Sequence, residues 1–220
     1  MIEENIKIIH DRIVAACGRV GSDPGAVTLL AVTKTVSVED IAHALRLGIR
    51  QIGESRIQEA LAKFPALKLE GVSKHLIGHL QTNKAKKAVE LFDVIESLDR
   101  LDLAREIDRH AKAAGKSQEC YLEIKVSEEE TKFGLPSGEA DDFLNKIAEF
   151  GNINITGVMA MAPYFEDPEL ARPFFRKAAD IFKKLNCRGC RTLSMGMSGD
   201  FDIAVEEGAN MVRIGTALFK

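Results

Sequence analysis

The sequence has few cysteines, no long apolar run and no excess of charge of either sign. Its cysteines, Cys17, Cys120, Cys187 and Cys190, are too few and too scattered for a disulfide framework, which fits a reducing compartment. No apolar run approaches the roughly 20 residues that a membrane helix needs. The 30 Lys and Arg residues nearly balance the 33 Asp and Glu residues, and the net charge of -3 gives no general attraction to nucleic acid or anionic lipid.

We expect neither a signal peptide nor an interdomain linker in this sequence. The first 20 residues are apolar only at the spacing of one helical face, whereas a signal peptide has a continuous apolar core. We therefore predict a cytoplasmic protein that contacts neither membrane nor nucleic acid. No stretch rich in Pro, Gly or Ser interrupts the 220 residues, of which 45% are hydrophobic and 29% charged. We expect one domain over residues 1–220.

Short β-branched runs alternate with amphipathic stretches along the whole chain, which is typical of parallel βα units. The stretches between the runs carry apolar residues at helical spacing. Eight such units predict a closed (βα)8 barrel of the TIM type, with an extra N-terminal helix covering the gap left where the chain ends soon after the eighth strand. The alternative is an open doubly wound sheet. The predicted strands are 27–34, 49–54, 74–80, 93–98, 120–126, 154–162, 191–198 and 210–216.

Lys34 ends the first predicted strand, in the stretch LLAVTKTVSVED, directly before a predicted helix. Ser37 is a plausible N-cap for that helix, and Asp40 stands three residues later, as in a capping box. Apolar surroundings favour an uncharged amine, which is the form that condenses with an aldehyde. A surface lysine just past a buried strand is the alternative interpretation.

The ends of the last two predicted strands carry a candidate phosphate site, which is where barrels of this type usually bind phosphate. Gly196, Ser198 and Gly199 precede a short helix, and Gly215 and Thr216 follow strand eight. Glycine allows close approach of the backbone to a ligand, and the hydroxyls and free helical N–H groups favour an anion. The alternative is that these glycines serve only turns.

Arg213 lies two residues before Gly215 and therefore on the same side of the pleat. One ligand that carries both an aldehyde and a phosphate would account for Lys34 and the phosphate site together. Pyridoxal 5'-phosphate carries both groups and needs an Asp or Arg partner at its ring nitrogen. A simple phosphorylated metabolite, contacted by Lys34 through charge alone, is the alternative ligand.

The sequence resembles the family of pyridoxal phosphate homeostasis proteins, which is related in fold to the N-terminal barrel of alanine racemase. The resemblance rests on five segments that occur in order along nearly the whole chain: LLAVTKT, QIGESRIQE, HLIGHLQTNK, TKFGL and SMGMSGDFDIAVEEGANMVRIGTALF. It implies that Lys34 holds pyridoxal 5'-phosphate as a Schiff base, that Ser198, Gly215 and Thr216 hold the phosphate, and that Arg213 faces the ring nitrogen. Ser55 stands where the family often has an asparagine that contacts the cofactor.

The resemblance also implies a role in intracellular homeostasis of the cofactor, without evident catalytic turnover and with apo-enzymes as possible recipients. It implies a monomer or weakly associating barrel, because the chain has no residues for the second domain that alanine racemase uses. That domain supplies a catalytic tyrosine, and with only Tyr121 and Tyr164 here no catalytic residue is predicted. The alternative function is a pyridoxal-phosphate-dependent, racemase-like enzyme acting on amino acids.

No metal site is predicted. His75 and His79 lie near the end of the third predicted strand, where rim or structural roles are favoured over metal ligation because further ligands of matching type are lacking. Cys187 and Cys190 form a CxxC that precedes a strand, unlike redox motifs that open a helix, and we interpret it as a loop.

Overall fold

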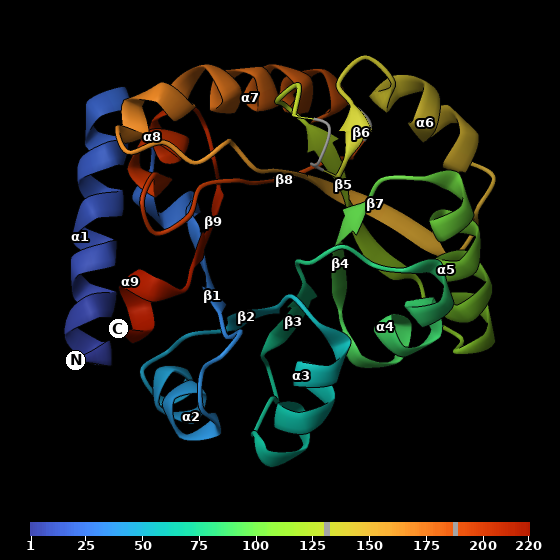
Figure 1. Cartoon of the computed structure of the whole chain (residues 1–220), viewed down its shortest axis with the longest axis horizontal. Coiled ribbons are helices and arrows are strands. Elements are labelled where there is room, and N and C mark those ends of the chain that lie inside the picture. The colour runs from blue at the N-terminus through green and yellow to red at the C-terminus, as the bar shows by residue number, and fades with distance from the viewer. Residues whose placement is uncertain (130–132, 187–188) are drawn as a thin grey trace.

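Parallel strands close into a barrel in the computed structural model, which describes residues 1–129, 133–186 and 189–220 (Figure 1). Within these residues each barrel strand pairs in parallel with the next, β4 pairs with β5, and β9 returns to β1. The predicted eight-stranded barrel is confirmed, and the open sheet is wrong because no strand edge remains between β1 and β9. The barrel strands are β1 (Thr28–Val32), β2 (Gln51–Glu54), β3 (Ser73–Leu76), β4 (Val94–Leu98), β5 (Gln118–Lys125), β7 (Ile153–Ala160), β8 (Thr192–Ser194) and β9 (Met211–Ile214).

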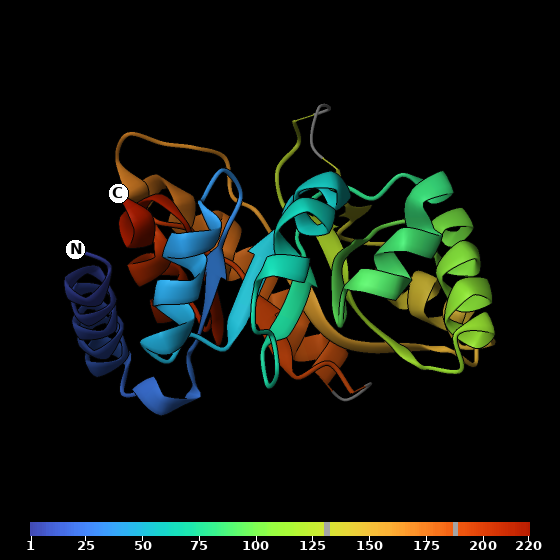
Figure 2. The ribbon, with the colours of Figure 1, turned by 90° about the horizontal axis from the view of Figure 1, so that it is seen from below.

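Helices surround the barrel, and their apolar stripes share one large core with the outward-facing side chains of the strands (Figure 1, Figure 2). On α5, for example, Leu103, Ile107 and Ala111 are fully buried at helical spacing. The α-helices are α1 (Ile2–Val20), α2 (Val38–Arg46), α3 (Ile57–Lys63), α4 (Ala85–Leu91), α5 (Leu101–Ala113), α6 (Ala140–Ile147), α7 (Arg172–Asn186), α8 (Phe201–Glu206) and α9 (Thr216–Phe219), with 3-10 turns at Pro24–Ala26, Phe64–Ala66, Thr82–Lys84 and Pro168–Ala171. None of the helices in the described part of the chain is both long and apolar enough to cross a membrane.

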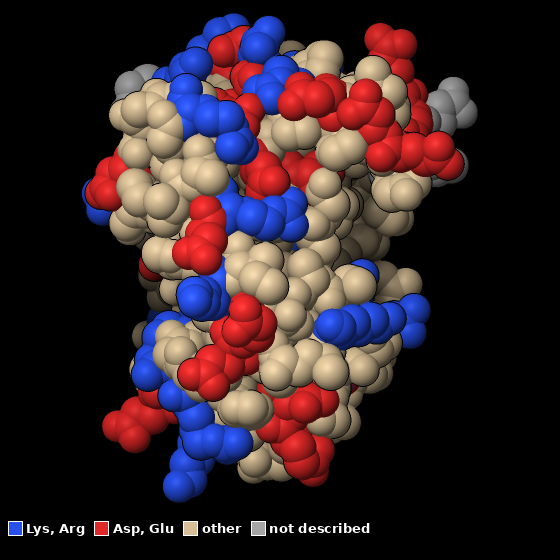
Figure 3. Space-filling view, turned by 90° about the vertical axis from the view of Figure 1, so that its left-hand side faces the viewer, with Lys and Arg blue, Asp and Glu red and all other residues tan. Residues whose placement is uncertain are grey.

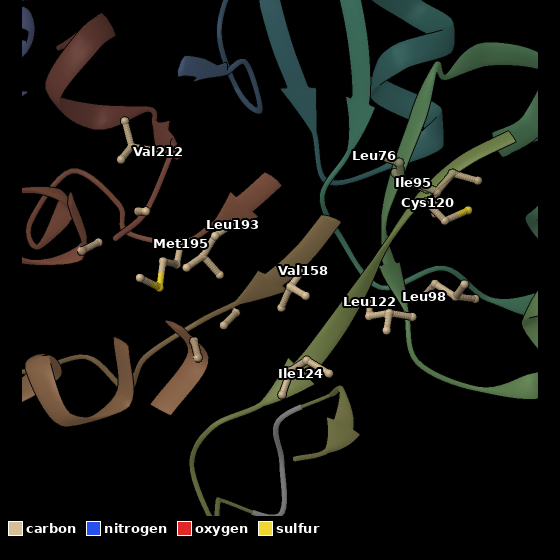
Figure 4. Close-up of a cluster of buried hydrophobic side chains, with 14 of the residues drawn as sticks. Leu76, Ile95, Leu98, Cys120, Leu122, Ile124, Val158, Leu193, Met195 and Val212 are labelled. Atoms are coloured by element: carbon tan, nitrogen blue, oxygen red, sulfur yellow. The ribbon is translucent and has the colours of Figure 1, made fainter. Parts of the chain in front are cut away.

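Alternate residues of several barrel strands belong to two different hydrophobic clusters, as the period of two requires. The outward set joins the helices in one large cluster, and Figure 4 shows part of it, including Leu122 of β5, Val158 of β7 and Leu193 of β8. The inward set forms a smaller cluster inside the barrel: Leu30, Val32, Val94, Tyr121, Met159 and Met211. Polar residues are buried within the barrel as well, and they bear on the site described below.

Helix α1 lies beside α8 and α9 and covers the gap at the end of the barrel, as predicted (Figure 1). The amide of Asn5 donates to the carbonyl of Leu218 at 3.0 Å, and the guanidinium of Arg12 pairs with Asp202 at 2.8 Å. Arg12 also stacks over the ring of Phe201, 4.2 Å from its centroid. On the face that α1 helps to form, basic and acidic side chains are interspersed (Figure 3).

Several predicted strand ends differ from the structure. Strand β1 ends at Val32 and β8 at Ser194, because the backbone turns after each of them: Thr35 and Gly196 both have positive φ, at 61° and 88°. A two-residue strand, β6 (Leu135–Pro136), pairs with the end of β5 and was not predicted. The motif TKFGL begins outside the described residues, at Thr131 and Lys132, and Cys187 of the CxxC lies outside them too.

Candidate functional site

A cavity of about 730 Å³ opens at the carboxyl ends of β1, β8 and β9. Its volume falls in the range usual for small-molecule sites. Five of the six candidate residues from the sequence line it: Lys34, Ser198, Arg213, Gly215 and Thr216. These residues come from opposite ends of the chain and meet because β1 and β9 pair in register, with Leu30 beside Arg213. The loop after β7, with Tyr164 and Phe165, completes the wall.

Lys34 lies in a tight turn beyond the strand end, with an exposed side chain. The N–H of Val36 donates to the carbonyl of Thr33 at 3.0 Å and closes the turn around Lys34 and Thr35. The predicted cap follows, since Ser37 Oγ accepts from the N–H of Asp40 at 3.1 Å and donates to its carboxylate at 2.9 Å. The helix start therefore fixes where the turn must end. Lys34 reaches the cavity from this turn instead of from within the strand.

The opposite wall of the cavity is built from two loops joined by a hydrogen bond. Ser198 Oγ, after β8, accepts from the N–H of Ala217, after β9, at 3.2 Å. Gly196 allows the first loop to turn, because a Cβ there would lie 2.5 Å from Ala204 Cβ. The carboxylate of Asp200 also lines the cavity and accepts from the N–H of Met197 at 2.6 Å; burial raises its pKa. Hydroxyl, backbone and glycine surfaces thus face the same space as the Lys34 amine.

Arg213 is 4% exposed and held by the barrel interior. Its Nη1 donates to both the carbonyl and the hydroxyl of Ser194, each at 2.7 Å, and its Nη2 donates to the carbonyl of Ala160 at 2.9 Å. No described residue accepts from its Nε. Three of its five N–H groups have these acceptors, so the Nε–H and the second N–H of Nη2 are left for a ligand of the cavity that Arg213 lines.

A buried polar chain extends from Arg213 across the barrel. The hydroxyl of Ser194 donates to Glu96 Oε2 at 2.7 Å, and Glu96 Oε1 lies 2.7 Å from Nδ1 of His75. Burial opposes the negative charge of Glu96. The hydrogen bonds from His75 and Ser194 and the charges of His75 and Arg213 outweigh burial and lower the pKa of Glu96. His75 also contacts Gln51 through Nε2 at 2.8 Å. This series of hydrogen bonds holds the Arg213 guanidinium in place beneath the cavity.

The sequence interpretation missed Glu96 and Ser194. Each is a polar residue at an inward position of an otherwise apolar strand, in DVIESL and RTLS, and that alternation was the available signal. For His75 and His79 the sequence favoured rim or structural roles. In the structure His75 is buried inside the barrel, and His79 stacks on Phe133 with ring centroids 3.8 Å apart.

Ser55 lies away from the other five candidates. It lines a neighbouring hollow of about 550 Å³ together with Arg56, His79, Gln81 and Lys84. Of the two tyrosines, Tyr121 is buried within the barrel, where burial raises its pKa, and Tyr164 is 87% exposed at the cavity wall. A contact from Ser55 to a ligand of the main cavity stays a prediction.

Comparisons with known proteins give consistent matches. A family model described as alanine racemase, N-terminal domain, matches residues 5–220. A pyridoxal phosphate homeostasis protein of Aquifex aeolicus is 40% identical over 219 residues, covering 98% of this chain and 96% of the relative. Another, of Escherichia coli K12, is 37% identical over 226 residues, covering 99% and 95%. The structure of PipY from Synechococcus elongatus PCC7942, with PLP bound, is similar with a TM-score of 0.87 and 33% identity, covering 100% of both chains.

Proposed function

Because the chain belongs to the family of pyridoxal phosphate homeostasis proteins, built on the alanine racemase N-terminal domain, we propose that it binds pyridoxal 5'-phosphate as a Schiff base on Lys34. The proposed role is intracellular homeostasis of that cofactor. The similar protein PipY has PLP in its structure. One observation carries the proposal here: a single cavity brings the exposed amine of Lys34 within the same walls as the glycine and hydroxyl surfaces after β8 and β9.

The residues present fit the two ends of the cofactor. Ser198 and Thr216 offer hydroxyls and Gly215 offers bare backbone, which suit a phosphate. A Cβ at Gly215 would meet Val32 at 3.4 Å, so the glycine leaves room at the cavity wall. The bound cofactor would supply an aldehyde carbon that condenses with the Lys34 amine, releasing one water, and a ring that withdraws electrons.

Arg213 would face the ring nitrogen through its Nε–H. An arginine stays protonated, so it donates a hydrogen bond and cannot give up a proton to the nitrogen. Ser194 and Ala160 hold its two terminal nitrogens, which sets the direction of the Nε–H. With the cofactor bound, this arrangement would weaken the electron-withdrawing power of its ring. A site that holds the cofactor without strongly activating it suits storage or delivery better than turnover.

We further propose that residues 1–220 act as one monomeric cytoplasmic binding domain that releases the cofactor to apo-enzymes. A second candidate function is that of a racemase-like enzyme, which one observation favours: the exposed Tyr164 lines the same cavity and offers a hydroxyl. Incubation of the loaded protein with a panel of amino acids in deuterium oxide separates the two. Deuterium at Cα supports the enzyme, and its absence supports the binding protein.

The experiment that tests the proposal is borohydride reduction after incubation with pyridoxal 5'-phosphate, followed by peptide mass mapping. We expect a stable pyridoxyl group on Lys34 and none on the Lys34→Ala variant. Lys86→Ala is the matched control, since Lys86 is an exposed lysine that lines neither cavity, and it should leave labelling unchanged. A wild-type protein that binds the cofactor without a reducible bond supports the phosphorylated-metabolite alternative instead.

A further inference from the structure

The turn that carries Lys34 is conformationally costly. Lys34 and Thr35 are its central residues, and Thr35 has a φ of 61°, the only positive value at a non-glycine among the described residues. At the third position of such a turn glycine or asparagine is usual, and a threonine in the left-handed region costs on the order of 1–2 kcal/mol. Contacts from elsewhere in the structure must therefore hold this turn in place.

Helix α3 provides contacts to both peptide groups that flank Lys34. On the far side, the N–H of Thr35 donates to Glu59 Oε2 at 3.0 Å. On the near side, Nζ of Lys63 donates to the carbonyl of Thr33 at 2.8 Å. Glu59 and Lys63 stand one helical turn apart and pair with each other at 2.9 Å. One ion pair thus holds the residues immediately before and after Lys34.

A buried carboxylate fixes the ion pair in turn. Glu54, at the end of β2, is fully buried, and its Oε1 accepts from Lys63 Nζ at 3.0 Å and from the hydroxyl of Thr33 at 2.7 Å. Nζ of Lys63 therefore donates to three oxygens, which is its full capacity. Only 14% of the Lys63 side chain is exposed. The three residues Glu54, Glu59 and Lys63 form what we call the α3 clamp.

The charges of Glu59 and Lys63 reinforce each other, whereas burial raises the pKa of Glu54. The bond from Lys63 and the bond from the Thr35 N–H lower the pKa of Glu59. Burial opposes the charge of Lys63, but its bonds to Glu59 and Glu54 outweigh burial and raise its pKa. Glu59 is therefore an anion and Lys63 a cation at neutral pH, and charge-assisted bonds of this kind are stronger than neutral ones.

We propose that Glu59 and Lys63 are positioning residues for Lys34: they hold its turn in the left-handed form that aims the amine into the cavity. Neither residue lines the cavity, so they act through the backbone and not through the ligand. The inference rests on the proposed function, since it says that the clamp holds Lys34 in the position in which it binds the cofactor. A ready-made geometry spares binding the cost of ordering the turn.

Two readouts test the clamp. The first is hydrogen exchange of the Thr35 amide in the cofactor-free protein, and the second is the dissociation constant for pyridoxal 5'-phosphate. Glu59→Ala should speed exchange at Thr35 and weaken binding, each by about 10-fold, because the turn loses its charge-assisted bond from the Thr35 N–H. Glu59→Gln keeps an acceptor and should stay within about 3-fold of wild type. Glu90→Ala removes an exposed carboxylate paired with Lys87 on α4 and is the matched control.

A second substitution separates positioning from a merely structural role. Glycine adopts a φ of 61° without steric cost, so adding Thr35→Gly to Glu59→Ala should recover most of the lost affinity. Recovery supports the proposal. Equal affinity of Glu59→Ala and wild type overturns it, as does a loss that the glycine leaves unchanged. If the wild-type protein itself fails to bind the cofactor, the proposed function is wrong. The rate at which a small amine-reactive reagent labels Lys34 then replaces affinity as the readout in the same comparison of variants.

Discussion

Arg213 and Ser194 are joined twice through one nitrogen: Nη1 of Arg213 donates to both the carbonyl and the hydroxyl of Ser194 at 2.7 Å. The hydroxyl in turn donates to Glu96. A single oxygen therefore links the cation at the cavity to a fully buried anion on the far side of the barrel. Without that oxygen, Arg213 and Glu96 would keep their charges but lose their connecting bonds.

Ser194→Ala should therefore lower the free energy of unfolding by about 2–4 kcal/mol, because it leaves a buried carboxylate oxygen without its donor. Urea unfolding at pH 7 measures this change. Ser22→Ala, at an exposed position, is the control and should remain within about 0.5 kcal/mol of wild type. A wild-type stability for Ser194→Ala would show that the buried chain contributes nothing to the fold.

Glu123 makes stability depend on pH. Burial raises its pKa from 4.5 to about 7, and one of its oxygens has no hydrogen-bond partner within the described structure. Between those two values the folded protein holds a proton that the unfolded chain has lost, so stability falls as pH rises through that window. Glu123→Gln removes this penalty. We expect the variant to be more stable than wild type by about 1–3 kcal/mol at pH 8, with the gain vanishing near pH 4.5.

Thermal or urea unfolding of both proteins from pH 4.5 to 8 checks the Glu123 prediction. Glu119→Gln changes an exposed carboxyl on the same strand and serves as the matched control. A gain for Glu123→Gln that is the same at every pH would contradict the argument, since it would arise from packing and not from titration.

Much of the fold follows from local pattern. The eight barrel strands could be predicted because each β-branched run is flanked by an amphipathic helix, and the helical cap at Ser37 because its hydroxyl and Asp40 stand at the usual spacing. Strand ends could not be located as well. They depend on turns such as Thr33–Val36, whose left-handed Thr35 is held by α3, a contact that sequence spacing alone does not reveal.

The site divides in the same way. Lys34, Ser198, Arg213, Gly215 and Thr216 could be grouped from the sequence because the ends of parallel strands meet at one edge of the barrel. The series of hydrogen bonds from Arg213 through Ser194 to Glu96 could not be predicted, because it crosses the barrel and joins residues as far apart in sequence as Ser194 and Glu96, which are 98 positions apart. Ser55 was chosen by resemblance, and its place in the neighbouring hollow depends on the path of a loop.

Gly78 lies against the loop that carries Ser55. A Cβ at position 78 would stand 2.2 Å from the backbone oxygen of Ser55, so one of the two loops must move. Gly78→Ala should cost about 2 kcal/mol or more of unfolding free energy. Gly18→Ala is a contrasting control: nothing lies within 4 Å of its added Cβ, and alanine favours the helix, so it should gain about 0.5–1 kcal/mol. Equal effects of the two substitutions would contradict the close approach of the loops.

Arg12 is one of three residues of α1, with Asn5 and Arg19, that make polar links to the end of the barrel in the described part of the chain. Its Nε and Nη2 both donate to Asp202 Oδ2, at 3.1 and 2.8 Å, while its guanidinium covers the ring of Phe201.

The Arg12–Asp202 pair is partly exposed, so Arg12→Ala should weaken the docking of α1 by about 1 kcal/mol, and amide exchange in α1 should rise about 5-fold. Arg12→Lys keeps the charge but cannot donate from two nitrogens. We expect its amide exchange in α1 to fall between that of wild type and that of Arg12→Ala. Lys7→Ala, an exposed change on the same helix, should leave exchange unaltered. If exchange in α1 were as slow in Arg12→Ala as in wild type, the apolar stripe of Ile9, Ile13 and Ala16 and the remaining polar links would be enough to hold the helix in place.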